Sequence, residues 1–364
     1  MSAPSVIVGL SGGVDSSVAA WMLLRAGYRV EGLFMKNWED DDEDGLCAAA
    51  EDLAHARRVC EVLGIPLHRV SFAREYRERV FRHFLSEYAA GRTPNPDVLC
   101  NREIKFGAFL RHARRLGADW VATGHYARIE HGRRGLWLLK GCDPAKDQSY
   151  FLHAVSARQL ERVLFPVGAL AKDEVRALAR EAGLPTHDRP DSTGICFIGE
   201  RPFREFLARY LPARPGEIRA LDGRVLGEHR GVAYYTIGQR AGLGIGGRAD
   251  AGEGAWYVVD KDPRTNVLYV AQGHEHPRLM ARAVLASGAS WVAGAPPPLP
   301  WRGHARIRHR HREAPCRVED LGGGRLRVAF DEPQRAPAPG QYVVLYDGER
   351  CLGGAVIDAC ETLG

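Results

Sequence analysis

The residues from position 9 to position 17 combine glycines, hydroxyls and one carboxylate in a pattern suited to binding a phosphate. They read Gly-Leu-Ser-Gly-Gly-Val-Asp-Ser-Ser and begin within a short apolar stretch, Val6 to Leu10. Gly12 and Gly13 permit positive φ angles and let the backbone approach a ligand closely. A helix beginning directly after this turn would direct its free N–H groups at an anion. The segment therefore predicts a strand, a glycine turn and a helix start.

The residues missing from this loop narrow the kind of nucleotide site. The loop has no Lys before its final Ser, as a Walker A loop requires, and no Gly-x-Gly-x-x-Gly spacing, as a dinucleotide fold requires. Its pattern Ser-Gly-Gly-x-Asp-Ser resembles the PP-loop of the ATP pyrophosphatase superfamily. That resemblance implies cleavage of ATP to AMP and pyrophosphate, with transfer of the adenylyl group to a carbonyl or carboxyl oxygen.

A second segment, residues 91–103, places a carboxylate and a thiol close together. It reads Gly-Arg-Thr-Pro-Asn-Pro-Asp-Val-Leu-Cys-Asn-Arg-Glu. Its two prolines and its turn-forming Asn and Asp predict a stiff loop over 91–100 that holds Asp97 and Cys100 on neighbouring positions. Asp97 could then handle protons while Cys100 attacks. A lone cysteine is more often a small buried apolar residue, and the flanking prolines weaken that alternative.

A third segment, residues 191–199, reads Asp-Ser-Thr-Gly-Ile-Cys-Phe-Ile-Gly. Cys196 lies in an apolar run, which by itself favours a cysteine buried in a strand. Nothing local indicates that Cys100 and Cys196 meet.

Composition bounds the class of protein. A chain of 364 residues predicts two or three domains. No run approaches the roughly 18 apolar residues of a membrane span, and no signal peptide is visible, so we expect a cytoplasmic protein without a membrane partner. The eight cysteines show no zinc spacing and are expected to be thiols. Lys stands at only six positions, so 44 of the 50 basic residues are Arg.

The first half of the chain alternates predicted strands and helices. Strands are expected over Val6–Leu10, Val30–Met35, Pro66–Val70 and Trp120–Thr123. Helices are expected between them, two of them ended by Gly27 and Gly64 and two more over 73–90 and 101–116. This alternation predicts a parallel sheet covered by helices on both faces. Ligands bind beyond the carboxyl ends of such strands, where the glycine loop and Gly124-His125 would both lie.

The pattern changes near residue 205, after which short β-like runs and glycine turns dominate. Such runs occur at Tyr234–Ile237, Trp256–Asp260 and Val267–Val270. We predict a PP-loop ATP-binding domain over 1–205, a small β-rich adaptor domain over 206–280 and a C-terminal β-barrel over 281–364. The glycine run 242–247 lacks a following helix and is assigned no dinucleotide. The acidic run 39–44 is assigned no metal.

Seven motifs together resemble the tRNA-specific 2-thiouridylase family (MnmA type). They run in order across almost the whole chain and begin with the Ser-Gly-Gly-Val-Asp-Ser loop. The others are Phe34-Met-Lys-Asn-Trp, the 91–101 segment, Thr123-Gly-His-Tyr, Lys146-Asp-Gln-Ser-Tyr-Phe-Leu, Ser192-Thr-Gly-Ile-Cys-Phe-Ile-Gly and Gly238-Gln-Arg-x-Gly-Leu-Gly-Ile-Gly-Gly. Cys351-Leu-Gly-Gly near the end also matches.

The resemblance implies an enzyme that replaces the C2 oxygen of the wobble uridine with sulfur, in tRNAs for Lys, Glu and Gln. It implies that ATP, with Mg²⁺, meets Gly9, Leu10, Ser11, Gly12, Gly13, Val14, Asp15, Ser16, Met35 and Gly124. It implies that the target base meets Asn95, Pro96 and Asp97. It implies that the remaining tRNA contacts come from His125, Lys146, Asp147, Gln148, Arg308, His309 and Gln341.

The implied chemistry explains why both an adenylate and two thiols would be needed. Adenylation of the uracil C2 oxygen makes AMP the leaving group, and a persulfide on Cys196 then attacks C2. Cys100 attacks the sulfur–sulfur bond and leaves a Cys100–Cys196 disulfide, with Asp97 as the candidate general acid or base. These thiolates are expected in a cationic, partly exposed setting. Two alternatives stay open: hydrosulfide released by Cys100, and an iron–sulfur cluster held by Asp97, Cys100 and Cys196.

The implied partners are tRNA and a sulfur donor, such as a cysteine desulfurase or a sulfur-relay protein, and we expect a monomer. A basic segment supports the RNA partner. Arg306-Ile-Arg-His-Arg-His-Arg312 alternates with period two, so as a strand it would present four arginines to one phosphate backbone. A merely soluble strand edge would also favour such charge.

Two other function classes remain. Another PP-loop enzyme, such as an adenylating ligase or amidotransferase synthetase, would need no pair of loop cysteines. A non-catalytic tRNA-binding protein with a degenerate ATP fold would not need Ser11, Asp15 and both cysteines, all of which are present.

Overall fold

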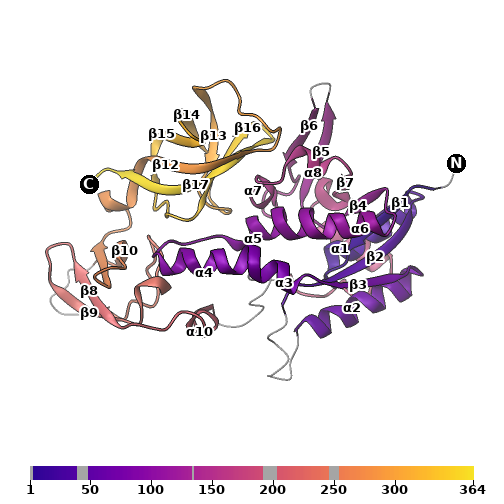
Figure 1. Cartoon of the computed structure of the whole chain (residues 1–364), viewed down its shortest axis with the longest axis horizontal. Helices are drawn as coiled ribbons and strands as arrows, with labels where there is room; N and C mark the ends of the chain where they lie inside the picture. The colour runs from indigo at the N-terminus through magenta and orange to yellow at the C-terminus, as the bar shows by residue number, and fades with distance from the viewer. Residues whose placement is uncertain (1–2, 39–47, 133–134, 192–202, 246–253) are drawn as a thin grey trace.

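The computed structural model describes residues 3–38, 48–132, 135–191, 203–245 and 254–364. Within these ranges the strands form three sheets, which Figure 1 shows as an N-terminal sheet at one end of the molecule and two β modules at the other. This arrangement confirms the predicted fold class, an α/β N-terminal unit followed by a small β-rich unit and a C-terminal barrel.

The N-terminal sheet is parallel, as the alternating pattern predicted. Its strand order is β3-β2-β1-β4-β7, and every neighbouring pair runs in the same direction. The strands are β1 Ser5–Gly9, β2 Arg29–Lys36, β3 Leu67–Ser71, β4 Trp120–Ala122 and β7 Val163–Leu164.

Helices cover both faces of this sheet. Successive side chains of a strand point to opposite faces, so each strand contributes to two cores. Val6 and Val8 of β1 pack in one core with helices α1 (Val14–Arg25), α2 (Ala48–Leu63) and α9 (Lys172–Glu181). Ile7, between them, packs in the other core with Tyr76 and Phe109. The sequence therefore folds into three layers with the sheet in the middle.

Two long helical segments contribute to that second core. The first comprises α3 Ala73–Tyr76, the π-helix η2 Arg77–Phe81 and α4 Arg82–Ala89. The second comprises α5 Pro96–Leu99, the π-helix η3 Cys100–Phe109 and α6 Leu110–Arg115. In Figure 1 the segment that ends in α6 lies beside the sheet, and the segment that ends in α4 extends from the sheet toward the β modules. Shorter helical turns are α7 Ser149–Leu152, α8 Ala157–Leu160, η4 Pro166–Ala169, α10 Phe203–Ala208, η5 Val232–Tyr234 and η6 Pro277–Leu279.

The predicted loop over 91–100 is wrong from residue 96 onward. Asn95 caps a helix there, accepting a hydrogen bond from the Asp97 N–H at 3.2 Å, and Pro96 occupies the first helical position. Proline fits that position because its missing N–H would have no helical partner anyway. The residues interpreted as loop formers therefore start a helix that continues through Cys100.

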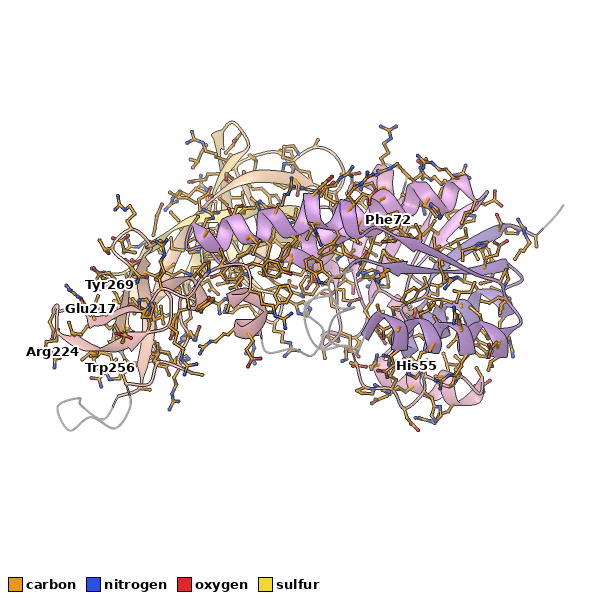
Figure 2. The ribbon with its side chains drawn as sticks, turned by 60° about the horizontal axis from the view of Figure 1, so that its bottom comes forward. His55, Phe72, Glu217, Arg224, Trp256 and Tyr269 are labelled. Atoms are coloured by element: carbon orange, nitrogen blue, oxygen red, sulfur yellow. The ribbon has the colours of Figure 1, made fainter. Side chains whose placement is uncertain are left out.

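The central module is a four-stranded sheet of order β10-β11-β8-β9. Its strands are β8 Gly216–Ala220, β9 Val225–His229, β10 Trp256–Asp262 and β11 Val267–Gln272. Figure 2 shows its labelled residues Glu217, Arg224, Trp256 and Tyr269 at the opposite end of the molecule from His55 and Phe72. The expected strand at Tyr234–Ile237 is wrong, since a 3₁₀ turn covers Val232–Tyr234.

The C-terminal module is a closed antiparallel barrel, as predicted. Six strands follow in the order β12-β15-β14-β13-β16-β17, and pairing of β12 with β17 closes the ring. They are β12 Met280–Trp291, β13 Trp301–Arg306, β14 Ala314–Gly322, β15 Arg325–Arg335, β16 Tyr342–Asp347 and β17 Arg350–Thr362. A hairpin from the N-terminal half, β5 Ala127–Gly132 and β6 Gly135–Lys140, extends this sheet through β17.

A buried ion pair fastens the barrel to the N-terminal half. Arg306, at the end of β13, lies 2.7 Å from the carboxylate of Asp147 and 2.7 Å from that of Glu313. The Asp147 side chain is 2% exposed and that of Arg306 is 13% exposed. Asp147 also accepts hydrogen bonds from the N–H groups of Gly141 and Ser149, so backbone donors share with Arg306 in stabilising its charge.

Replacing Arg306 with Met should lower the free energy of unfolding by about 3–5 kcal/mol, because it leaves the Asp147 charge buried without its cation. Urea unfolding followed by circular dichroism measures this loss. Arg302→Met is the matched control from the same strand: its pair with Asp331 lies at 3.3 Å on the surface and should contribute at most about 1 kcal/mol. Equal losses in the two variants would contradict this assignment.

Candidate functional site

The glycine loop has the local structure that the sequence predicted. β1 ends at Gly9, Gly12 has φ +79°, and α1 begins at Val14. The Ser16 hydroxyl accepts a hydrogen bond from the Ser11 N–H at 3.2 Å, which closes the turn over the start of the helix. A Cβ at Gly12 would lie 2.5 Å from the carbonyl oxygen of Asp52. Glycine is therefore required at position 12 by backbone conformation and by space.

Gly124 lies directly against this helix start. It follows β4, and a Cβ on it would stand 2.6 Å from the Ser16 nitrogen and 2.7 Å from the Asp15 carbonyl carbon. The two motifs expected at the carboxyl edge of the sheet are thus adjacent. Met35, near the end of β2, is half-buried and packs against the core that contains Ile7.

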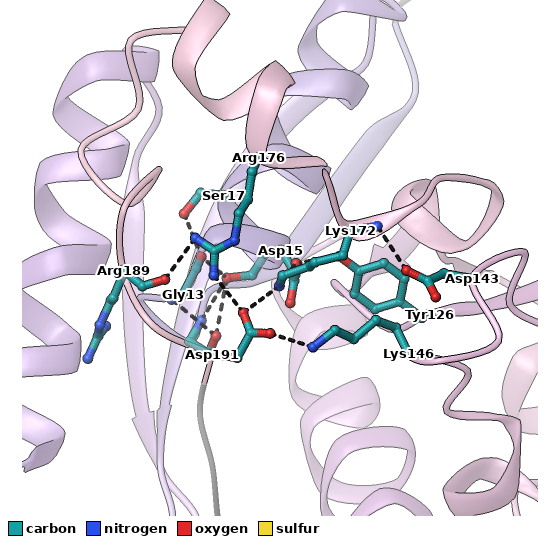
Figure 3. A network of polar contacts seen from close by, with 12 residues as sticks. Gly13, Asp15, Ser17, Tyr126, Asp143, Lys146, Lys172, Arg176, Arg189 and Asp191 are labelled. Carbon is teal, nitrogen blue, oxygen red and sulfur yellow. Dashed lines mark hydrogen bonds and ion pairs between the residues drawn. The ribbon is translucent and has the colours of Figure 1, made fainter. Parts of the chain in front are cut away.

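A network of charged groups joins the loop to the end of the N-terminal half (Figure 3). The Lys172 ammonium lies 2.6 Å from Asp15 and 2.8 Å from Asp191. Lys146 lies 2.5 Å from the second carboxylate oxygen of Asp191. The Tyr126 hydroxyl donates to Asp15 at 2.7 Å. Three chain regions that are distant in sequence therefore meet beside the N-terminus of α1.

Two arginines complete the network. Arg176 binds Asp191 at 2.9 Å and donates to the carbonyl oxygens of His187 and Arg189. Arg189 donates to the Gly12 carbonyl oxygen at 2.7 Å and to the Asp52 carboxylate at 2.5 Å. The backbone of the glycine loop is thereby tied to α2 and to residues 187–191.

The charges shift the proton affinities of the groups around Lys172. Burial alone would raise the pKa of Asp191, but hydrogen bonds and charge from Lys146 and Lys172 outweigh it and lower the pKa to about 2. Burial and the charge of Asp15 raise the pKa of Tyr126 above its ordinary value. At neutral pH Asp191 is thus a carboxylate among cations, and Tyr126 is a hydrogen-bond donor.

Sequence reasoning missed Lys172, Asp191, Tyr126, Arg176 and Arg189. A usable signal existed in the scarcity of lysine, because two of only six lysines in the chain meet here. Asp191 carried no signal of its own, since its role depends on which distant cations surround it.

Asp97 and Cys100 stand three positions apart on the continuous helix α5–η3, a spacing that places two side chains on one helix face. The predicted neighbourhood of these two residues therefore arises from a helix instead of a stiff loop. The expectation of a partly exposed thiol is not met at Cys100, which is 1% exposed. Cys196 and the motif 192–199 lie outside the described residues, as does the acidic run 39–44.

The residues expected to meet tRNA near position 147 have internal partners. Lys146 pairs with Asp191, Asp147 with Arg306, and the Gln148 side-chain oxygen accepts from the Tyr126 N–H at 2.9 Å. His125 is buried between Phe106 and Phe165, with Nδ1 2.7 Å from the Thr123 hydroxyl. Its burial, reinforced by the charge of Lys105, holds the pKa of His125 well below its ordinary value.

The expected strand over 306–312 is wrong, and its arginines do not form one row facing water. β13 ends at Arg306, and turns and bends follow. Arg308 donates to the carbonyl oxygens of Ile237 and Ala336, and His309 contacts the Asp147 carbonyl oxygen at 2.9 Å. Carbonyl oxygens of three other segments bind these two side chains, so the period-two pattern of residues 306–312 does not determine their structure. Arg310 and Arg312 remain exposed.

Gln341, also expected to contact tRNA, joins the barrel to the segment before α5. Its amide donates to the Thr93 carbonyl oxygen at 2.7 Å, and the Thr93 N–H donates to the Pro339 carbonyl oxygen at 2.8 Å. The barrel thus holds the chain just before Asn95, Asp97 and Cys100.

Within the described ranges, no three His, Cys, Asp or Glu side chains cluster in a way that could hold a metal ion. None of the helices in those ranges combines the length and apolar character that crossing a bilayer requires.

A parallel sheet, a glycine loop without a Walker lysine and a helix N-terminus beside it define a nucleotide-binding α/β domain of the PP-loop class, here joined to two β modules. Family models match the three parts in turn: "tRNA methyl transferase HUP domain" over residues 4–200, "tRNA methyl transferase PRC-barrel domain" over 204–272 and "Aminomethyltransferase beta-barrel domain" over 281–357.

Full-length relatives identify the family more closely. A protein of Marinobacter nauticus named tRNA-specific 2-thiouridylase MnmA is 58% identical over 97% of this chain and 91% of its own length. Proteins of the same name from Methylococcus capsulatus and Nitrosomonas eutropha are 59% and 57% identical, each over 98% of this chain and 96% and 99% of their own lengths. The chain belongs to the tRNA-specific 2-thiouridylase family.

Replacing Gly124 with Ala should weaken ATP binding at least about tenfold, because the new methyl group would collide with the backbone of the first turn of α1 and displace its N–H groups. Isothermal titration calorimetry with ATP measures the effect. Gly254→Ala, where a Cβ would lie 3.3 Å from the flexible Gln272 side chain, is the control and should bind ATP normally. Unchanged affinity in a folded Gly124→Ala variant would show that ATP does not use this edge.

Proposed function

We propose that this protein is an ATP-dependent sulfurtransferase that converts the wobble uridine of tRNAs for Lys, Glu and Gln to 2-thiouridine. The observation that carries the proposal is its full-length similarity, at 57–59% identity, to proteins named tRNA-specific 2-thiouridylase. The presence of Ser11, Asp15, Asp97, Cys100 and Cys196 supports an active enzyme over a binding protein with a decayed ATP fold.

ATP would bind with its phosphates at the start of α1, the site described by the glycine loop and Gly124. Backbone N–H groups at a helix N-terminus favour such an anion. Lys172 and Lys146 already hold a carboxylate, that of Asp191, and phosphate oxygens would meet the same cations. Mg²⁺ usually enters such sites with the nucleotide and takes one or two carboxylates as ligands, for which Asp15 and Asp191 are the candidates.

The reaction would proceed in three balanced steps. The C2 oxygen of uridine attacks the α-phosphorus of ATP, and pyrophosphate leaves. The terminal sulfur of a Cys196 persulfide attacks C2 and AMP leaves, which gives a C2–S–S–Cys196 adduct. The Cys100 thiolate attacks the Cys196 sulfur, so the S–S bond breaks, 2-thiouridine is released and a Cys100–Cys196 disulfide forms. An external thiol reductant then restores both thiols.

The continuous helix α5–η3 would supply reactive side chains for two kinds of step, proton transfer and disulfide formation. Asp97, at its N-terminal end, would move protons during adenylation or attack. Cys100, one turn further along, is buried in the described structure, so the disulfide-forming step requires its sulfur to become accessible. Two alternative sulfur routes differ in when or whether this disulfide forms. If Cys100 attacks the Cys196 sulfur of the persulfide before C2 is attacked, hydrosulfide leaves and the same Cys100–Cys196 disulfide forms, whereas an iron–sulfur cluster on Asp97, Cys100 and Cys196 would require no disulfide.

The remaining assignments extend this proposal to the partners. The target base would meet Asn95 to Asp97, and the rest of the tRNA would meet the surfaces near His125, Lys146, Arg308, His309 and Gln341. A cysteine desulfurase or a sulfur-relay protein would load Cys196, and the enzyme would act as a cytoplasmic monomer.

Cys100→Ser and Cys196→Ser should each reduce 2-thiouridine formation at least about 100-fold, because each removes one sulfur of the exchange. Mass spectrometry of anticodon nucleosides, after incubation with ATP, Mg²⁺ and a persulfide source, measures the product. Cys142→Ser, at an exposed cysteine, is the control. Full thiolation by either cysteine variant would exclude the disulfide route. Absence of product from the enzyme without substitutions would overturn the proposed function.

Lys172→Met should raise the KM for ATP at least about tenfold, because it removes a buried cation from the proposed phosphate site. Release of pyrophosphate in the presence of unmodified tRNA measures the change. Lys261→Met, at a half-buried lysine of the central sheet that donates to the Tyr235 carbonyl oxygen, is the matched control. An unchanged KM in the Lys172 variant would place the phosphates elsewhere.

A further inference from the structure

The side chain of Gln159 joins helix α8 to the π-helix that begins at Cys100. Its oxygen accepts hydrogen bonds from the N–H and the hydroxyl of Ser156, at 3.1 and 3.0 Å. Its amide nitrogen donates to the carbonyl oxygens of Arg102 at 3.0 Å and Phe106 at 2.9 Å. Both hydrogens and the oxygen of this one amide are therefore engaged, with the two donors directed into η3.

The segment that Gln159 contacts has an unusual backbone. η3 extends for 10 residues from Cys100 to Phe109, whereas π-helical structure is rare and mostly limited to single turns. In a π-helix each carbonyl accepts from the N–H five residues on, so relaxation to the ordinary four-residue spacing is a competing state. Hydrogen bonds from outside to carbonyls within the segment favour the register in which those carbonyls are directed toward the donor.

Two further contacts hold the same segment at close quarters. The Asn101 amide donates to the Phe151 carbonyl oxygen at 3.2 Å. Gly107, five residues after Arg102, leaves so little room that a Cβ would stand 3.0 Å from the Arg102 carbonyl oxygen. Arg102 thus has its carbonyl enclosed between its own helix and Gln159, which fixes its direction.

We propose that Gln159 is a positioning residue: its amide holds η3 in the π register and thereby fixes where the Cys100 sulfur stands. The inference rests on the proposed role of Cys100 and adds to it a residue 59 positions away in the chain. Cys100 is the first residue of the segment, so a change from five-residue to four-residue spacing anywhere along η3 turns its N-terminal end, with Cys100 and Asp97, relative to the sheet.

Gln159→Glu tests this role with almost no change of shape. A carboxylate keeps the acceptor for Ser156 but replaces the two donors with an oxygen that repels the carbonyls of Arg102 and Phe106. Ser156→Ala is the matched control, since it weakens the same helix start but leaves both donors to η3 in place. Gln159→Leu, which removes the donors without adding charge, replaces the glutamate variant if that variant does not fold.

Two readouts separate positioning from general stability. The first is the rate at which iodoacetamide alkylates Cys100 in the folded protein, followed by peptide mass spectrometry with the exposed Cys142 as internal reference. The second is the kcat and the KM for ATP in the thiolation of unmodified tRNA. Thermal unfolding of each variant gives the stability change for comparison.

We expect Gln159→Glu to raise the Cys100 alkylation rate at least about tenfold and to lower kcat at least about tenfold, with the KM for ATP within about twofold. Ser156→Ala should change neither readout more than about twofold, even if it lowers the Tm equally. Equal effects of the two variants, or an unchanged alkylation rate in both Gln159 variants, would overturn the proposal. The alkylation readout does not need tRNA thiolation, so failure of the proposed function would be recognised separately.

Discussion

The buried ammonium of Lys172 is the interaction on which the arrangement at the nucleotide edge depends. It lies between Asp15, in the first turn of α1, and Asp191, and each carboxylate has a further donor of its own. Taking charged groups out of water costs several kcal/mol per ion unless partners compensate them. Each charged group of this network is paired with a group of opposite charge. The start of α1, helix α9 and residues 187–191 are therefore held in fixed relative positions.

The same logic operates where the barrel meets the N-terminal half. Asp147 is held by backbone N–H groups from its own neighbourhood and by Arg306 from the barrel. Gln341 and Thr93 add uncharged hydrogen bonds across the same junction, next to the start of α5. The barrel therefore contributes to the geometry of the helix that carries Asp97 and Cys100, whatever it contacts on its outer surface.

The sequence was sufficient for features that are local or periodic. The alternation of apolar strands and amphipathic helices predicted the parallel sheet, and the residue types of positions 9–17 predicted the turn and the helix start. It was insufficient wherever a contact with a residue distant in the sequence determines the local structure. Asn95 and Pro96 favour turns and helix starts equally well, and packing against the neighbouring helices selects the helix. The pattern around Arg308 and His309 is typical of an exposed strand, but in the folded chain these side chains bind carbonyl oxygens of three other segments. Asp191 shows no pattern of its own, because only the folded chain brings Lys146 and Lys172 to it.

The β5–β6 hairpin belongs by sequence to the N-terminal half but hydrogen-bonds to β17 of the barrel. Cutting the chain before the barrel would therefore leave β6 paired with β5 alone, and its other edge, which meets β17 at Leu138 and Leu139, would lose its partner. An unprotected strand edge of this kind pairs readily with another chain, so a truncated N-terminal fragment is prone to self-association. The N-terminal and C-terminal modules that the family models separate are thus not independent folding units, and expressing the N-terminal module alone exposes a strand edge that the barrel otherwise covers.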